Sequence, residues 1–128
     1  MESTDKPWYK SLNKSKLTPP DYVFPIVWTI LYLMIITSFV IYLSGNKTTL
    51  GIILFCIQMA LNLSWSPVFF KFKKPKIALV IVGLMWISIL GTIISFNLTN
   101  PLASYLLIPY LVWVSLATYL NYYIVANN

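Results

Sequence analysis

The chain has 128 residues, of which 59% are hydrophobic and only 9% are charged, and its mean hydropathy is +0.76. Soluble domains carry about 25% charged residues, so this composition is typical of an integral membrane protein. Nine lysines and three acidic residues give a formal charge of +6, but the lysines flank apolar segments, which argues against nucleic-acid binding. With no histidine and a single cysteine, Cys56, the sequence predicts no metal site, no catalytic residues and no required cofactor.

Residues 1–22 form a polar leader that contains three prolines. A secretory signal peptide needs an apolar core soon after its start, and here the first apolar run begins only at Val23. The sequence therefore predicts an extended leader, in which Trp8 and Tyr9 lie at the membrane surface as interfacial anchors.

Four uncharged runs follow, and each is long enough to cross a bilayer. The predicted helices cover residues 23–43, 50–70, 77–98 and 102–125, with a short tail at residues 126–128. A helix rises about 1.5 Å per residue, so about 20 residues span the ~30 Å hydrocarbon core. Because the connections are short, successive helices must run antiparallel and adjacent. The predicted fold is all-α, a single transmembrane helical bundle of residues 23–125.

The distribution of lysines predicts the orientation of this bundle. Eight of the nine lysines lie on the side shared by the N-terminus and the loop after residue 70, and only Lys47 lies opposite. Positively charged residues gather on the cytoplasmic side of membrane proteins. We therefore expect a multi-pass protein with both termini in the cytoplasm.

Aromatic and amide side chains recur at helical spacing in the first two predicted helices. Trp28 and Tyr32 share one face at i and i+4, and Gln58, Asn62 and Trp65 follow at i, i+4 and i+7. Amides are costly in hydrocarbon unless they find partners, so Gln58 and Asn62 should face the bundle interior. There they either line a cavity or link neighbouring helices by hydrogen bonds.

The last predicted helix carries the most informative face. Tyr110, Trp113, Ala117 and Asn121 fall at i, i+3, i+7 and i+11, so one face presents rings, a small gap and an amide. This face suits a ligand, with the Trp113 indole as a wall beside the space that Ala117 leaves. Alternatively, the aromatic residues mark the membrane interface and the small residues allow close helix packing.

Three segments together resemble the TspO/MBR family of translocator and tryptophan-rich sensory proteins. They read WYKSLNKSKLTPPDYVFPIVWTILY, QMALNLSWSPVFF and PLASYLLIPYLVWVSLATYLNYYI. The resemblance implies a helical membrane protein, usually a homodimer, with a pocket for porphyrins, other haem-pathway tetrapyrroles, sterols and similar apolar ligands. The family normally has five spanning helices, and this chain begins where the first of them would end. Tyr122 is not followed by the basic residue of the sterol-associated pattern, so cholesterol recognition through that motif is not expected.

Helical spacing and this resemblance together predict one ligand-binding set on three helices. Its members are Trp28, Tyr32, Asn62, Trp65, Trp113, Ala117 and Asn121. The resemblance further implies that Trp28 and Trp113 take part in porphyrin photodegradation.

Three functions are therefore considered. The first is a membrane receptor or sensor that binds a porphyrin or a similar hydrophobic ligand. The second is a small-molecule transporter, although proton-coupled exporters need a carboxylate within the membrane and no acidic residue follows Asp21. The third is porphyrin degradation that depends on light and oxygen. The expected partners are the lipid bilayer, a small hydrophobic ligand and a second copy of the chain, which would contact the small residues Cys56, Ala60 and Ser64.

Overall fold

The computed structural model describes residue 12 and residues 14–128, and within them every regular element is helical. Trp8 and Tyr9, the predicted interfacial anchors, lie outside the described residues. The described part of the leader turns at residues 16–17 and again at residues 21–22. Ser15 in this segment is buried, and its hydroxyl donates to the Tyr119 hydroxyl at 3.4 Å. The leader thus contacts the last helix of the bundle.

Four helical segments are long and apolar enough to cross a membrane, which confirms the predicted fold class. The elements are α2 (Val23–Ser44), α3 (Thr49–Ser66) with its π-helical continuation η1 (Pro67–Lys71), α4 (Pro75–Asn97), α5 (Pro101–Leu106) and α6 (Ile108–Asn127). The last span is interrupted at Leu107, whose N–H bonds to the Ser104 carbonyl at 3.1 Å. Pro109 follows and has no N–H to continue the regular helical pattern. The predicted helix of residues 102–125 is therefore two helices in one span.

Two side-chain caps fix the turns at the end of the bundle that carries Lys47. The Thr48 hydroxyl accepts from the Gly51 N–H at 3.0 Å where α3 begins. The Asn100 side-chain carbonyl accepts from the Ala103 N–H at 3.2 Å where α5 begins. Such caps satisfy amide groups that the first helical turn leaves unpaired. Both chain reversals at this end are thus held by local hydrogen bonds.

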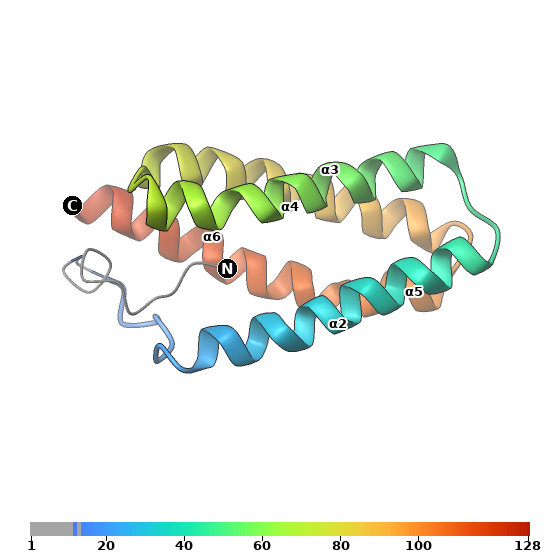
Figure 1. Cartoon of the computed structure of the whole chain (residues 1–128), viewed down its shortest axis with the longest axis horizontal. Coiled ribbons are helices and arrows are strands. Elements are labelled where there is room, and N and C mark those ends of the chain that lie inside the picture. The colour runs from blue at the N-terminus through green and yellow to red at the C-terminus, as the bar shows by residue number, and fades with distance from the viewer. Residues whose placement is uncertain (1–11, 13) are drawn as a thin grey trace.

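The helices form one elongated bundle in which α2 stands apart from α3 (Figure 1). Helix α4 packs extensively against α3 and α6, whereas α2 packs mainly against α5 and makes few backbone-level contacts with α3. Figure 1 shows α2 and α3 converging only at the turn that joins them, so the expectation that all successive helices lie side by side is wrong for this pair. Along the rest of α2, large side chains must therefore bridge the distance to α3.

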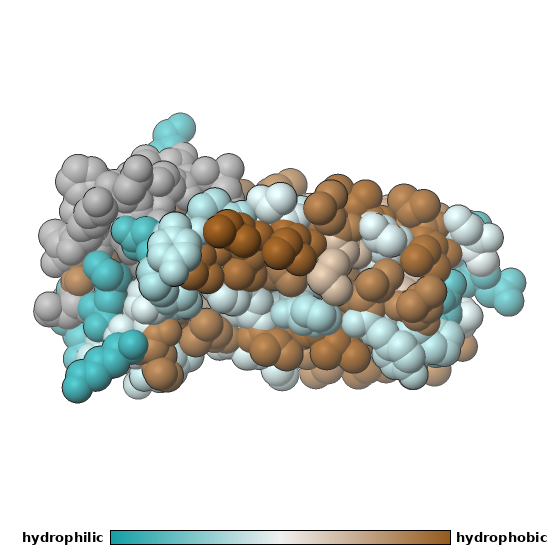
Figure 2. Space-filling model, turned by 90° about the horizontal axis from the view of Figure 1, so that it is seen from below, coloured by the Kyte–Doolittle hydropathy of each residue, from teal (hydrophilic) through white to brown (hydrophobic). Residues whose placement is uncertain are grey.

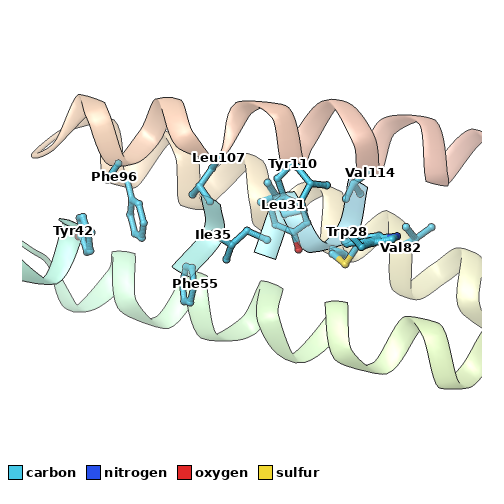
Figure 3. Packing of buried hydrophobic residues seen from close by; sticks show 13 residues of the cluster. Trp28, Leu31, Ile35, Tyr42, Phe55, Val82, Phe96, Leu107, Tyr110 and Val114 are labelled. Atoms are coloured by element: carbon cyan, nitrogen blue, oxygen red, sulfur yellow. The ribbon is translucent and has the colours of Figure 1, made fainter. Parts of the chain in front are cut away.

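A continuous apolar core runs along the bundle axis. Figure 3 shows it extending from Trp28 and Val114 at one end to Tyr42 and Phe96 at the other. The outer faces of the helices are also apolar, and the face seen in Figure 2 is largely hydrophobic along its middle. This surface suits contact with lipid chains on the outside of a spanning bundle.

The fold separates the lysines as their order in the sequence predicts. The segments of residues 14–22 and 71–76, which hold six lysines, lie at the end that holds the C-terminus, and the turn of residues 45–48, which contains Lys47, lies at the other end (Figure 1). The side of the membrane on which each end lies stays a prediction.

Candidate functional site

Aromatic side chains fill the space between α2 and α6 near the start of α2. Trp28 is only 6% exposed and lies at the centre of this group. Its ring centroid is 5.7 Å from that of Tyr32 and 6.4 Å from those of both Tyr110 and Trp113. The Trp28 and Trp113 rings stand almost perpendicular, at 89°. Edge-to-face pairs of this kind contribute about 0.5–1.5 kcal/mol each beyond the burial of their surface.

Trp113 is the member of this group with an unsatisfied polar atom. Its Nε1 is buried without a hydrogen-bond partner, and only the Thr99 hydroxyl shares this property among the described side chains. A buried donor without an acceptor costs about 1–3 kcal/mol. The other side of the Trp113 ring meets Phe24, with ring centroids 5.7 Å apart. The indole is therefore held by packing against the core, and its N–H is left with an unused capacity to donate a hydrogen bond.

A chain of four polar side chains crosses the bundle beside the aromatic group. The Tyr32 hydroxyl donates to Asn62 Oδ1, and Asn62 Nδ2 donates to the Tyr110 hydroxyl at 2.6 Å. The Tyr110 hydroxyl in turn donates to Gln58 Oε1 at 2.7 Å. Gln58 and Asn62 are each 1% exposed and Tyr110 is fully buried. Both predicted amides thus face the interior, and they act as links that connect α2, α3 and α6.

Trp65 and Asn121 form a separate polar pair. On α3, Trp65 follows Asn62 by about one helical turn, toward the end of the bundle that holds the C-terminus. Trp65 Nε1 donates to Asn121 Oδ1 at 2.9 Å, and Asn121 Nδ2 donates to the Pro75 carbonyl at 2.9 Å. The Trp65 ring also stacks on Phe69, with centroids 5.4 Å apart and planes inclined by 29°. Trp65 and Asn121 therefore satisfy each other and anchor the start of α4 to α6.

The predicted set of residues falls into two groups in the structure. Trp28, Tyr32, Asn62 and Trp113 meet directly or through Tyr110, and half-buried Ala117 packs against the same core one turn beyond Trp113. Trp65 and Asn121 bond to each other and form the second group. Whether either group binds a ligand stays a prediction.

Three further residues complete the site and were absent from the predicted set. Phe24 contacts the Trp113 ring, and Tyr110 and Gln58 complete the polar chain. Each carried a signal, since Phe24 precedes Trp28 by one helical turn, Gln58 precedes Asn62 by one turn, and Tyr110 shares the face of Trp113.

The chemistry available at this site is limited to indole, hydroxyl and amide groups. No charged residue occurs between Val23 and Ser44 or between Ile108 and Asn127. In the described ranges, no three His, Cys, Asp or Glu side chains come together as metal ligands do. The site therefore suits a flat apolar ligand with a few hydrogen-bonding groups.

A sequence model of the TspO/MBR family matches residues 1–126. The chain belongs to the TspO/MBR family. It is similar to the tryptophan-rich protein TspO of Chlorobaculum tepidum, at 43% identity over 98% of this chain and 84% of the relative. It is also similar to the tryptophan-rich sensory protein of Cereibacter sphaeroides, at 39% identity over 90% and 73% of the two chains. The human translocator protein is 35% identical over 94% of this chain and 75% of its own length.

These matches confirm the resemblance that three sequence segments indicated. This TspO/MBR protein is a multi-pass membrane protein of the group that includes tryptophan-rich sensory proteins and translocator proteins. The residues of the aromatic group and of the polar chain all lie within the matched range.

Proposed function

We propose that this TspO/MBR protein binds porphyrins, or similar hydrophobic tetrapyrrole or sterol-like ligands, within the membrane between α2, α3 and α6. The observation that carries the proposal is Trp113. Its indole stands edge-on to Trp28, its buried N–H has no acceptor, and small Ala117 follows one turn later. A flat aromatic ligand would displace neighbouring rings and stack on the indole over the small side chain of Ala117, and a polar group on it would accept from the N–H.

The position of α2 supports entry of such a ligand. Helix α2 has few close contacts with α3, and beyond the turn that joins the two helices a polar link between them is the bond from Tyr32 to Asn62. A ligand that enters between the helices would exchange ring-to-ring contacts within the protein for contacts of its own.

Titration of the purified protein in nanodiscs with protoporphyrin, in darkness, tests the proposal. Trp113→Ala should weaken binding about tenfold or more, because both stacking and burial are lost. Ala117→Phe should have at least as large an effect, since it fills the space for the ligand. Trp86→Phe is a matched control, because the Trp86 indole bonds to the Ser115 hydroxyl at 2.8 Å on the seam between α4 and α6.

The opposing interpretation is that Trp113 serves only to pack the bundle. In that case Trp113→Ala would lower thermal stability while the folded fraction bound protoporphyrin as the parent does. If Trp113→Ala and Ala117→Phe both fold and bind with parental affinity, the site is wrongly assigned.

One observation favours a second activity at the same site. Trp28 and Trp113 are two oxidisable indoles in contact with each other, and both would touch a bound porphyrin. With light and molecular oxygen as co-reactants, bound protoporphyrin would then be degraded. Loss of its absorbance under illumination, compared between the parent and Trp28→Phe, would test this activity, and equal loss would count against it.

We also propose that both termini lie in the cytoplasm, because six of the seven lysines in the described ranges gather at the end that holds the C-terminus. In a Cys56→Ser background, a cysteine at Asn128 should react with an impermeant reagent only from the cytoplasmic side. A cysteine at Ser44 should react only from outside. The reverse pattern would overturn the orientation.

A homodimer is the proposed assembly. Cys56, Ala60 and Ser64 are exposed along one stripe of α3, where small side chains allow a second helix to approach closely. Mass measurement in nanodiscs should give a dimer that Ala60→Leu weakens. A monomer mass for the parent in nanodiscs and in several mild detergents would exclude it.

A further inference from the structure

The turn between η1 and α4 concentrates positive charge at one end of the bundle. We call residues 71–76 the lysine turn. It reads KFKKPK, and all four lysines are exposed. Within the described part of the chain, none of these lysines forms an ion pair. The charge of the turn is therefore available to an external partner.

The backbone of the lysine turn is held by several hydrogen bonds. The Phe72 N–H bonds to the Pro67 carbonyl at 3.0 Å, and the Lys74 N–H bonds to the Val68 carbonyl at 3.1 Å. On the other side, the Pro75 carbonyl accepts from Asn121 of α6. These bonds fix the direction in which the turn leaves the bundle, so its lysines stay at the end of the spanning helices.

Lys73 occupies a backbone conformation that favours glycine. Its φ is 55°, and it is the one non-glycine residue with positive φ among the described residues. Lysine adopts this left-handed conformation less readily than glycine does. Glycine would thus suit the backbone here better, so one of the four charges of the lysine turn is kept at a conformational cost.

An aromatic ring accompanies the charges. The Phe72 side chain is 57% exposed, and the Lys71 ammonium lies 5.8 Å from its ring centroid. Because η1 ends one candidate membrane span and α4 begins the next, we expect this ring to lie at the depth of the bilayer interface and the ammonium groups at the level of the lipid headgroups. An acidic soluble protein or a nucleic acid would match the charges, whereas the membrane interface matches both the charges and the exposed ring.

We propose that the lysine turn binds anionic phospholipid headgroups and selects them over zwitterionic ones. Clusters of four or more basic residues directly beside a membrane span attract anionic lipid, and each lysine near the surface strengthens the attraction about fivefold. Phe72 would insert beside the bound headgroup, and the ammonium groups would contact its phosphate. Among the described residues, the opposite end of the bundle carries only Lys47, and it should not discriminate between lipids.

Native mass spectrometry of the full chain, released from nanodiscs that hold equal phosphatidylglycerol and phosphatidylcholine, tests this proposal. The parent should retain phosphatidylglycerol preferentially. The triple variant Lys73→Gln, Lys74→Gln, Lys76→Gln should lose on the order of a hundredfold in this preference, about fivefold for each charge removed. The matched control Lys47→Gln should keep the parental preference, and a triple Lys→Arg variant should restore it because the charge is kept.

Further measurements distinguish binding of a lipid headgroup from binding of other anions. Raising the salt concentration should weaken the preference, because exposed charges are screened. Inorganic phosphate at millimolar concentration should not displace the lipid, and an acidic peptide should bind more weakly than phosphatidylglycerol. The proposal is overturned if the parent retains both lipids equally, if the Gln triple variant behaves as the parent does, or if phosphate or the peptide competes with the lipid.

Discussion

The two ends of the bundle use aromatic side chains in different ways. At the Lys47 end, rings lie flat on one another: Tyr42 stacks on Phe96 with centroids 3.8 Å apart, and Phe39 stacks on Phe55 at 3.9 Å. At the tryptophan end, which comprises Trp28 and its neighbouring rings, the centroids are 5.7–6.4 Å apart and the rings meet at an angle. The first arrangement brings the ring planes into close face-to-face contact, whereas the second leaves wider spacings between ring centres.

This difference also appears in how α2 is held along its length. Near the Lys47 end, the Ser38 hydroxyl donates to the Ala103 carbonyl at 2.6 Å, and α2 packs directly on α5. At the tryptophan end, α2 reaches α3 through the bond from Tyr32 to Asn62. We infer that the Lys47 end sets the position of α2 and that the tryptophan end admits the ligand. Three substitutions test this division, ordered from the largest expected effect to the smallest.

Gly51→Ala should destabilise the Lys47 end by about 3 kcal/mol, the upper part of the range for overpacking a core. An added Cβ would overlap the Tyr42 hydroxyl and lie 2.8 Å from Cζ of that ring. The ring cannot move aside, because it stacks on Phe96 and its hydroxyl accepts from the Thr48 N–H at 2.8 Å. Unfolding by SDS in mixed micelles measures the loss. The folded fraction should still bind protoporphyrin within about twofold of the parent.

Gly83→Ala is the matched control, since a Cβ at Gly83 meets no atom within 4 Å. In α4 it should leave stability unchanged or raise it by up to about 1 kcal/mol, the difference in helix propensity. Equal losses in the two variants would show that Gly51 is not a site of close approach. A loss of ligand affinity in Gly51→Ala equal to its loss of stability would show that the two ends are not separable.

Tyr110→Phe should cost about 1–3 kcal/mol, because it removes the hydroxyl in the middle of the polar chain. Asn62 Nδ2 and Gln58 Oε1 would each lose a partner while remaining buried. The same SDS titration measures this loss, and Tyr105→Phe is the control because Tyr105 is 60% exposed on α5. A loss below 0.5 kcal/mol would mean that the polar chain contributes little to the fold.

The sequence predicts the helices of this protein well, because apolar runs, prolines and lysines are local signals. The predicted second helix, residues 50–70, covers nearly all of the span Thr49–Lys71. Local signals do not reveal the π-helical geometry of η1, which depends on packing of Phe69 and Phe70 against the ends of other helices. They also do not reveal that Gly51 admits the Tyr42 ring, since this contact depends on how two helices meet after their turn.

The sequence predicts which side chains of the candidate site face the interior of the bundle, but not which of them bond to each other. Helical spacing placed Asn62 and Trp113 toward the interior, because polar and small residues share a face there. Whether Asn62 lines a cavity or links helices depends on a partner 48 residues away, Tyr110, and spacing within one helix does not contain that information. For the same reason, Trp65 and Asn121 could be placed on inner faces but not paired with each other.

Tyr32→Phe should have the smallest effect on stability, about 0.6 kcal/mol, the average for a hydrogen bond between membrane helices. Tyr32 is only half-buried, and the change removes the partner of one atom, Asn62 Oδ1, whereas Tyr110→Phe removes the partners of two. Asn62 Nδ2 keeps its bond to Tyr110. The effect on ligand entry should be clearer, because this bond must open when a ligand separates α2 from α3. Loss of 0.6 kcal/mol from that barrier predicts association with protoporphyrin about threefold faster, measurable by stopped-flow quenching of tryptophan fluorescence.

Ser38→Ala removes the hydrogen bond that holds α2 to α5 near the Lys47 end. Comparing it with Tyr32→Phe shows whether only the tryptophan end opens when the ligand enters. It should lower stability by a similar amount, about 0.6 kcal/mol, because it too breaks one bond between membrane helices. It should leave the association rate unchanged, since the Lys47 end does not open when the ligand enters. If both variants speed association equally, the whole of α2 moves as a rigid body when the ligand enters, and not the tryptophan end alone. If neither does, the ligand does not pass between α2 and α3, and the bond from Tyr32 to Asn62 serves only to hold the fold.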